Sequence, residues 1–265
     1  MKALEAFNAG RLTDAVRLAT DEVRNAPQDV AARYVLAEML CFVGEFERAD
    51  NQLDTAVTLD PSRALSIIQF RQLVRGEQAR QDCFEAGRPP QFLVEPSPGI
   101  RDRLGTIVQM RAGDVSAARA ALERAEGQRR SMAGVCNGKP FDDLRDADDT
   151  VADVLEVLTG DGRYFWVPFE IVRSIDFEKP ERARDLLFRQ ADLQTSADLN
   201  GPVFIPALYA GTHRDSRDEM RLGRGTDWIG EGPVRGVGQR VFIAGEDDPA
   251  ILQVESIEIR GGAPA

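Results

Sequence analysis

Residues 141–171 read FDDLRDADD, then TVADVLEVLTG, then DGRYFWVPFEI, and this stretch divides the chain into two unlike parts. Before it, apolar residues recur with the spacing of paired helices. After it, short aromatic and β-branched runs alternate with turn residues, as in strands. We therefore expect an α+β protein in two parts. Residues 1–131 form a helical repeat domain, and residues 132–265 form a small α+β domain with a curled, mostly antiparallel sheet.

The first sixty residues repeat themselves at an offset of 34. The matched positions are Gly10 and Gly44, Leu12 and Phe46, Ala15 and Ala49, Val23 and Val57, and Pro27 and Pro61. A glycine at the turn, a small residue soon after it and a terminal proline are typical of tetratricopeptide repeats. Glycine permits the turn, alanine lets two helices approach closely, and proline ends the second helix. The sequence thus predicts TPR-like α-hairpins.

Further along, the repeat becomes less regular. Residues 62–80 favour one long helix with Leu65, Ile68, Leu73 and Val74 facing inward, and residues 86–99 are too rich in proline for anything but a loop. A last hairpin turns at Gly113. Residues 127–140, GQRRSMAGVCNGKP, are interpreted as the linker between the two domains.

In the second part, residues 150–159 have a helical stripe made of Val151, Val154, Leu155 and Leu158, which predicts a helix. Strands are expected at 164–167, where Pro168 restricts the strand to an edge or an ending, and at 183–195 and 201–209. Residues 218–229 hold another short element. Two closing strands are expected to pair across a turn at 246–249.

Charge and composition exclude several classes of function. Residues 1–131 carry 18 basic and 19 acidic side chains, whereas residues 132–265 carry 15 and 25, so −10 of the net charge of −11 lies in the second part. Such a surface repels phosphate backbones, and we expect no nucleic-acid partner. The chain has no apolar run long enough for a membrane helix, and we expect no export signal. Three widely spaced cysteines suit a reducing compartment, which predicts a cytoplasmic protein.

The acidic run is the first candidate for chemistry. Its carboxylates suit Mg²⁺ or Ca²⁺, and a metal-dependent enzyme centred on 142–149 is one hypothesis. However, the run lacks the glycine and the distal glutamate of an EF-hand loop, and Arg145 lies within it. We favour a structural acidic junction in which Arg145 and a helix start neutralise four aspartates, namely Asp142, Asp146, Asp148 and Asp149.

No catalytic constellation is visible elsewhere. His213 is the only histidine, and it accompanies no nucleophile elbow. The glycine pairs at 222–225 and 236–238 form neither a phosphate-binding loop nor a dinucleotide fingerprint. The residues therefore predict no catalytic residue, no metal and no cofactor. Stacked hairpins leave a groove that suits a peptide or helix, although the stack can also serve only to brace the second domain.

A succession of motifs in the second part resembles the ImpE family, also called TagJ or SciE. The motifs are FDDLRDADD, LEVLTGDGRYFWVPFE, RARDLLFRQA, GPVFIPALY, and LGRGTDW followed by GPVRGVGQRVF, and they span about 140–245. Phe165 and Phe188 stand where the family pattern has tyrosine or tryptophan. The resemblance implies a non-enzymatic accessory protein of bacterial type VI secretion. It implies binding to the N-terminal helix of the small sheath subunit, TssB, and a link to the disassembly ATPase ClpV. A chaperone for sheath subunits is a further alternative.

The resemblance supplies no contact residues, so the partner site is inferred from clustering alone. Buried aromatic anchors dominate helix-in-groove interfaces. Four aromatic side chains of the second part are therefore the candidate contacts: Trp166, Phe169, Tyr209 and Trp228.

Overall fold

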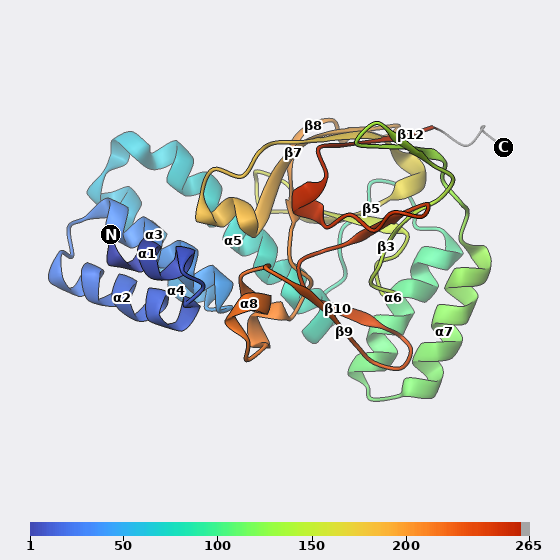
Figure 1. Ribbon diagram of the computed structural model, residues 1–265, viewed down its shortest axis with the longest axis horizontal. Coiled ribbons are helices and arrows are strands. Elements are labelled where there is room, and N and C mark those ends of the chain that lie inside the picture. The colour runs from blue at the N-terminus through green and yellow to red at the C-terminus, as the bar shows by residue number, and fades with distance from the viewer. Residues whose placement is uncertain (261–265) are drawn as a thin grey trace.

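The computed structural model describes residues 1–260 and divides them between a helical part and a β-rich part (Figure 1). The helices before the first strand are α1 (Lys2–Asn8), α2 (Leu12–Asn25), α3 (Val30–Phe42), α4 (Phe46–Leu59), α5 (Ala64–Glu85), α6 (Pro98–Arg111) and α7 (Val115–Gln128). The strands are β1 (Gly134–Cys136), β2 (Lys139–Phe141), β3 (Leu144–Asp146), β4 (Val154–Leu158), β5 (Tyr164–Pro168), β6 (Val172–Phe177), β7 (Phe188–Thr195), β8 (Gly201–Pro206), β9 (Thr226–Ile229), β10 (Arg235–Gly238), β11 (Phe242–Ala244) and β12 (Ser256–Ile259).

The repeat predicted at the N-terminus is confirmed as two stacked hairpins, α1–α2 and α3–α4, followed by α5. Gly10 and Gly44 adopt φ values of +80° and +74° at the two inter-helix turns, a conformation that side chains disfavour. Ala15 and Ala49 are fully buried where neighbouring helices meet. The side chain of Asp29 caps α3 through the backbone N–H groups of Ala31 and Ala32.

The long helix α5 extends to Glu85, beyond the predicted end at residue 80. Leu73 and Val74 are buried as predicted, but Leu65 and Ile68 are 89% and 42% exposed, so their assignment to the core was wrong. The helix turns other side chains inward because the α1–α4 stack and the sheet lie on different sides of it. Ile67 and Phe70 occupy the positions expected of Leu65 and Ile68.

The α6–α7 hairpin lies at the opposite end of the molecule from α1–α4 (Figure 1). It is fastened to the β-rich part rather than continuing the stack. Arg103 of α6 reaches Asp153 at 2.7 Å, and Arg119 of α7 donates to the carbonyl of Gly232 at 3.0 Å. The repeat architecture therefore ends at α5.

Eight strands form one antiparallel sheet in the order β2-β1-β12-β6-β7-β8-β4-β5. Residues 127–140 are not a free linker, because β1 and β2 form a hairpin at one edge of this sheet. The other edge is β5, which ends at Pro168 as predicted. Gln91 from the proline-rich loop pairs with Phe165 and satisfies part of that edge.

The helix expected at 150–159 was wrong, since the segment is a turn followed by strand β4. All five residues of β4 are buried because the sheet is covered on both faces. Val154 and Leu158 face the core shared with the helices, while Leu155 and Val157 face a second core. A strand buried on both faces gives a continuous apolar run, which also satisfies helical spacing.

The strands predicted at 183–195 and 201–209 are present with adjusted boundaries. Residues 183–195 begin as a 3₁₀ turn, Ala183–Leu186, before β7, and residues 218–229 contain the short helix α8 (Asp218–Arg221) and β9. The turn at 246–249 is present, closed by bridges that join Val241 to Ala250 and Ala244 to Asp247. The closing strands do not pair with each other, because β11 pairs with β3 and β12 lies between β1 and β6.

Candidate functional site

A groove of about 760 Å³ lies on the inner face of the helical stack and is called the inner groove below. Helices α1, α3 and the start of α5 form its floor, and residues 180–186, which connect β6 to β7, form one wall. Its apolar lining includes Leu4, Val30, Ala31, Ile67 and Leu186. The two parts of the chain thus build the groove together.

The charges around the inner groove balance. Arg63 and Arg182 oppose Glu181 at the rim and Glu38 on the floor. Glu38 is the only one of these that is buried, at 4% exposed. Burial raises its pKa to about 7, although Arg184 and Arg182 act in the opposite direction.

Another hollow, of about 440 Å³, lies between α6, the end of α7 and the sheet. Two of its charged side chains, Arg129 and Asp153, are already paired within the protein: Arg129 contacts the carboxylate of Asp143, and Arg103 contacts that of Asp153. The inner groove is larger and offers more apolar surface. It is therefore the better candidate for an amphipathic partner.

Three of the four aromatic residues predicted to contact a partner are inaccessible. Trp166 is completely buried, and Phe169 and Tyr209 are each 2% exposed. Their size fills the two cores: Trp166 packs edge-on against Phe92, and Phe169 against Phe242. Without a rearrangement, none of the three can touch a partner.

Trp228 is the exception, at 42% exposed. It lies on the β9–β10 hairpin, and its ring packs on Tyr209 with centroids 5.9 Å apart. Trp228 stays a candidate contact. It lies on a hairpin that is distant in sequence from the residues that line the inner groove.

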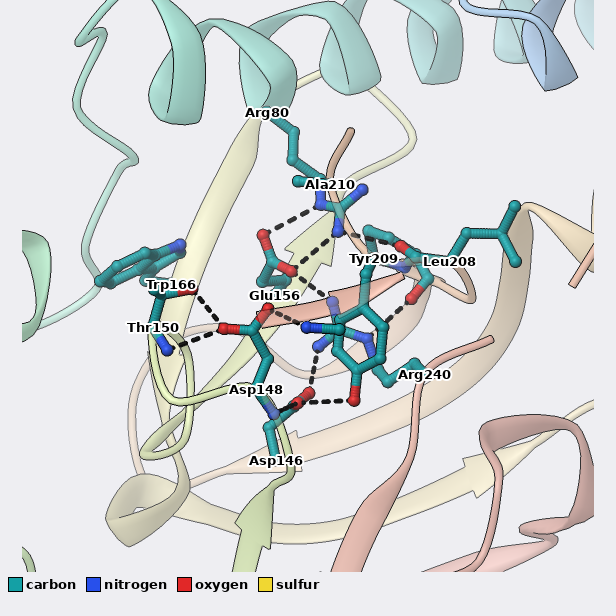
Figure 2. Close-up of polar contacts among 12 residues, drawn as sticks. Arg80, Asp146, Asp148, Thr150, Glu156, Trp166, Leu208, Tyr209, Ala210 and Arg240 are labelled. Carbon is teal, nitrogen blue, oxygen red and sulfur yellow. Dashed lines mark hydrogen bonds and ion pairs between the residues drawn. The ribbon is translucent and has the colours of Figure 1, made fainter. Parts of the chain in front are cut away.

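A buried ionic network joins the helical and β-rich parts, as Figure 2 shows. Arg80 of α5 donates to both oxygens of Glu156 on β4, at 2.9 and 3.0 Å, and to the carbonyl of Leu208 at 3.0 Å. Arg240 contacts the other side of Glu156 and donates to Asp146 at 2.8 Å. Tyr164 also donates to Glu156. Every member is at least 97% buried.

The pKa values in this network follow from the number of cations each carboxylate meets. Burial by itself would raise the pKa of Glu156, but Arg80 and Arg240 hold that pKa at about 2, so the group is ionised. Burial raises the pKa of Asp146 to about 7, because Arg240 is shared and Asp148 adds a like charge. The charged groups of the network therefore satisfy one another, and the network links the helical part to the β-rich part.

The acidic run itself is placed at the centre of the β-rich part. Asp146 and Asp148 are buried, and Asp148 accepts hydrogen bonds from the backbone N–H groups of Thr150 and Gly236, at 2.8 and 3.0 Å. Asp149 accepts from Val234 N at 2.8 Å and from Arg145 at 3.0 Å.

Asp142 is exposed, at the start of the run. Because the helix expected at 150–159 is absent, no helix start neutralises the run. Backbone N–H groups and arginines take that role.

Two other side chains with potential chemistry, His213 and Cys41, lie at the contact between the two parts of the chain. His213 packs against Phe46 and over Gly44 at the contact between the two parts. The nearby Cys41 is buried, which raises the pKa of its thiol well above the ordinary value. The void between them is only about 20 Å³. Within residues 1–260, no group of three or more histidine, cysteine or carboxylate side chains has the arrangement of a metal site.

Sequence reasoning missed the inner groove as a site shared by both parts, and it missed Glu38. A signal for Glu38 was present, since it is the one acidic residue within the apolar helix VAARYVLAEMLCF. No sequence pattern indicated that residues 180–186 would form a wall of the groove.

A family model and a curated relative place the chain in one family. The model of the ImpE protein family matches residues 138–258. Over 258 residues the chain is 32% identical to the type VI secretion system accessory component TagJ of Pseudomonas aeruginosa, covering 97% of this chain and 91% of that protein. An X-ray crystal structure of a Vibrio parahaemolyticus protein has the same fold, with a TM-score of 0.92, 24% identity and 99% of both chains covered. No helix within residues 1–260 has the length and apolar character needed to cross a bilayer.

Proposed function

This chain belongs to the ImpE family of type VI secretion accessory components, and we propose that it is a non-enzymatic adaptor whose inner groove holds an amphipathic helix. The proposed helix is the N-terminal helix of the small sheath subunit, a TssB-like protein. The observation that carries this proposal is the inner groove itself. It is open and largely apolar, has a volume of about 760 Å³, and lies between the stacked helices and the wall formed by residues 180–186.

The physical fit supports a helix as the ligand. Grooves formed by helical repeats present their inner helices side by side, and an amphipathic helix fills such a groove with anchors at i, i+3, i+4 and i+7. Leu4, Val30 and Leu186 are only partly buried, so they retain apolar surface for those anchors. The acidic second part favours a basic outer face on the incoming helix, which would increase the association rate more than the affinity.

A single substitution tests the groove. Ala31 is exposed on α3 and lines the groove, so Ala31→Glu introduces a charge and extra volume with little effect on folding. We expect it to weaken binding of a labelled peptide of the sheath subunit's first helix at least tenfold, about 1.4 kcal/mol. Fluorescence anisotropy measures the dissociation constant.

The matched control is Ala120→Glu on the exposed face of α7, which should leave the affinity unchanged. A dissociation constant for the unaltered protein weaker than about 1 mM, worth about 4 kcal/mol, would refute specific recognition. If Trp228→Ala abolished binding while Ala31→Glu did not, the site would be the β9–β10 hairpin instead.

The proposed adaptor role includes a link to ClpV. A pull-down with this protein as bait separates two roles within secretion. An adaptor recovers sheath subunits together with ClpV, whereas a chaperone recovers sheath subunits alone.

A further inference from the structure

Glu38 occupies an unusual position on the floor of the inner groove. It is 4% exposed, and within residues 1–260 no side-chain nitrogen of a lysine or arginine comes within 4 Å of its carboxylate. From the described residues its carboxylate accepts one hydrogen bond, which is long, 3.4 Å from the backbone N–H of Arg184. A buried carboxylate with so little compensation costs free energy in the unbound protein.

The nearby arginine is directed elsewhere. The guanidinium of Arg184 lies over the rings of Tyr34 and Phe70, at 5.8 and 5.4 Å from their centroids. Its Nε is 3.6 Å from the carboxylate of Asp185. The protein thus keeps a cation close to Glu38 but engages it with aromatic faces and another acid.

We infer that Glu38 is a specificity residue, which receives a lysine or arginine side chain carried by the helix bound in the inner groove. The inference rests on the proposed function and deepens it by naming the chemistry that the groove selects. Much of the surrounding lining is apolar, and Arg63, Arg182 and Glu181 lie at the rim, so a cation placed on the floor meets the Glu38 carboxylate in a poorly hydrated setting. In such a setting a charge-assisted hydrogen bond is stronger than at the surface.

The arrangement also selects against other helices. A helix with an apolar residue at this position would cover the carboxylate without offering it a hydrogen-bond donor. An acidic residue there would add a like charge. Recognition is therefore a combination of apolar anchors and one cation within the buried face. The position of Glu38, between Tyr34 and Phe42 on α3, sets where along the bound helix that cation lies.

The test is a double-mutant cycle in the full-length protein. The probe is a labelled synthetic peptide of the sheath subunit's first helix, together with variants in which each lysine or arginine is replaced by glutamine in turn. We expect Glu38→Gln to weaken binding of the original peptide about tenfold. One peptide variant should lose the same factor on the unaltered protein and lose nothing more on Glu38→Gln.

Two further variants sharpen the result. Glu181→Gln, a matched change at the exposed rim, should alter the affinity less than threefold. Glu38→Met removes the buried charge, is expected to fold at least as stably, and should lose affinity as Glu38→Gln does.

The outcomes separate the two claims. If Glu38→Gln and Glu38→Met bind the peptide as the unaltered protein does, or if no peptide variant is coupled to Glu38, the inference is overturned while the adaptor role stands. If the original peptide fails to bind the unaltered protein, the adaptor proposal falls, and this inference falls with it.

Discussion

At the scale of single residues, the fold depends on one carboxylate held between two arginines. Glu156 meets Arg80 from the helical part and Arg240 from the β-rich part, and all three are buried. Such groups are costly to bury, but removing one partner is costlier, because it leaves a charge uncompensated. Glu156 therefore couples the packing of α5 to that of β4.

Glu156→Gln should lower the free energy of unfolding by about 3 kcal/mol at pH 7, because two guanidinium groups lose their shared anion. Denaturant unfolding followed by circular dichroism measures the change. The control is Glu258→Gln on the exposed face of β12, which should stay within about 0.5 kcal/mol of the unaltered protein.

The pKa of Glu156 predicts how this difference in the free energy of unfolding depends on pH. The pKa of Glu156 is depressed from 4.5 to about 2 in the folded state, so its contribution is present above pH 4.5 and is lost as the pH falls through 2. The difference between Glu156→Gln and the unaltered protein should shrink across that window. A difference that is constant from pH 6 to pH 2 would contradict the assignment.

Residue types alone could not identify the contact residues. Trp166, Phe169 and Tyr209 look like interface anchors because large aromatics serve both interfaces and cores. Which use applies depends on the covering layers, and those are set by contacts distant in sequence. Glu38 is the opposite case. Its place in a groove depends on residues 180–186, which are distant from α3 in sequence and form the wall of that groove.

At the scale of elements, the acidic run holds the β9–β10 hairpin in place. The outer N–H groups of Val234 and Gly236 are bound by the carboxylates of Asp149 and Asp148. Side chains thus take the place of a neighbouring strand. The sequence indicated a structural role for the run, but its partners lie about 85 residues away and no local pattern predicts them.

Asp148→Ala should expose the hairpin to exchange, because it leaves the N–H groups of Thr150 and Gly236 without an acceptor, at a cost of about 1–3 kcal/mol. Hydrogen exchange read by mass spectrometry should show faster exchange over 226–238. Asp142→Ala, an exposed position in the same run, is the matched control and should change nothing.

The same proteins test the metal hypothesis. Because these carboxylates already accept hydrogen bonds from backbone and arginine groups, calorimetric titration with Mg²⁺, Ca²⁺ and Mn²⁺ should reveal no site tighter than millimolar. Micromolar binding that Asp148→Ala abolishes would instead support the metal-dependent enzyme.

At the scale of the whole molecule, the two predicted parts share one of the two hydrophobic cores. Residues of α1–α6 pack in one cluster with Val154, Tyr164 and Trp166 of the sheet, and with Phe188 and Phe204 on the neighbouring strands. Sequence periodicity located the α-hairpins and the strands β5, β7, β8, β11 and β12, because those patterns are local. It could not show that the sheet uses the helical stack as its cover, since that depends on contacts between distant segments.

The division at residues 131 and 132 stays a proposal about sequence units, and the shared core sets its physical meaning. A fragment of residues 1–131 would expose the apolar face of α5 and leave Arg80 without Glu156. We expect it to be largely unfolded or aggregated when produced alone, because exposing this surface removes much of a margin of stability that is about 5–15 kcal/mol for a typical domain.

Circular dichroism and thermal unfolding of the fragment measure this directly, with the full chain as the reference. Co-expression of residues 1–131 with 132–265 is the matched control, and it should restore a folded complex because every contact of the shared core is then available. A cooperative unfolding transition of the isolated fragment near that of the full chain would show two independent domains. In that case the Arg80–Glu156 contact would join preformed units, and Glu156→Gln would release the units from each other without unfolding either one.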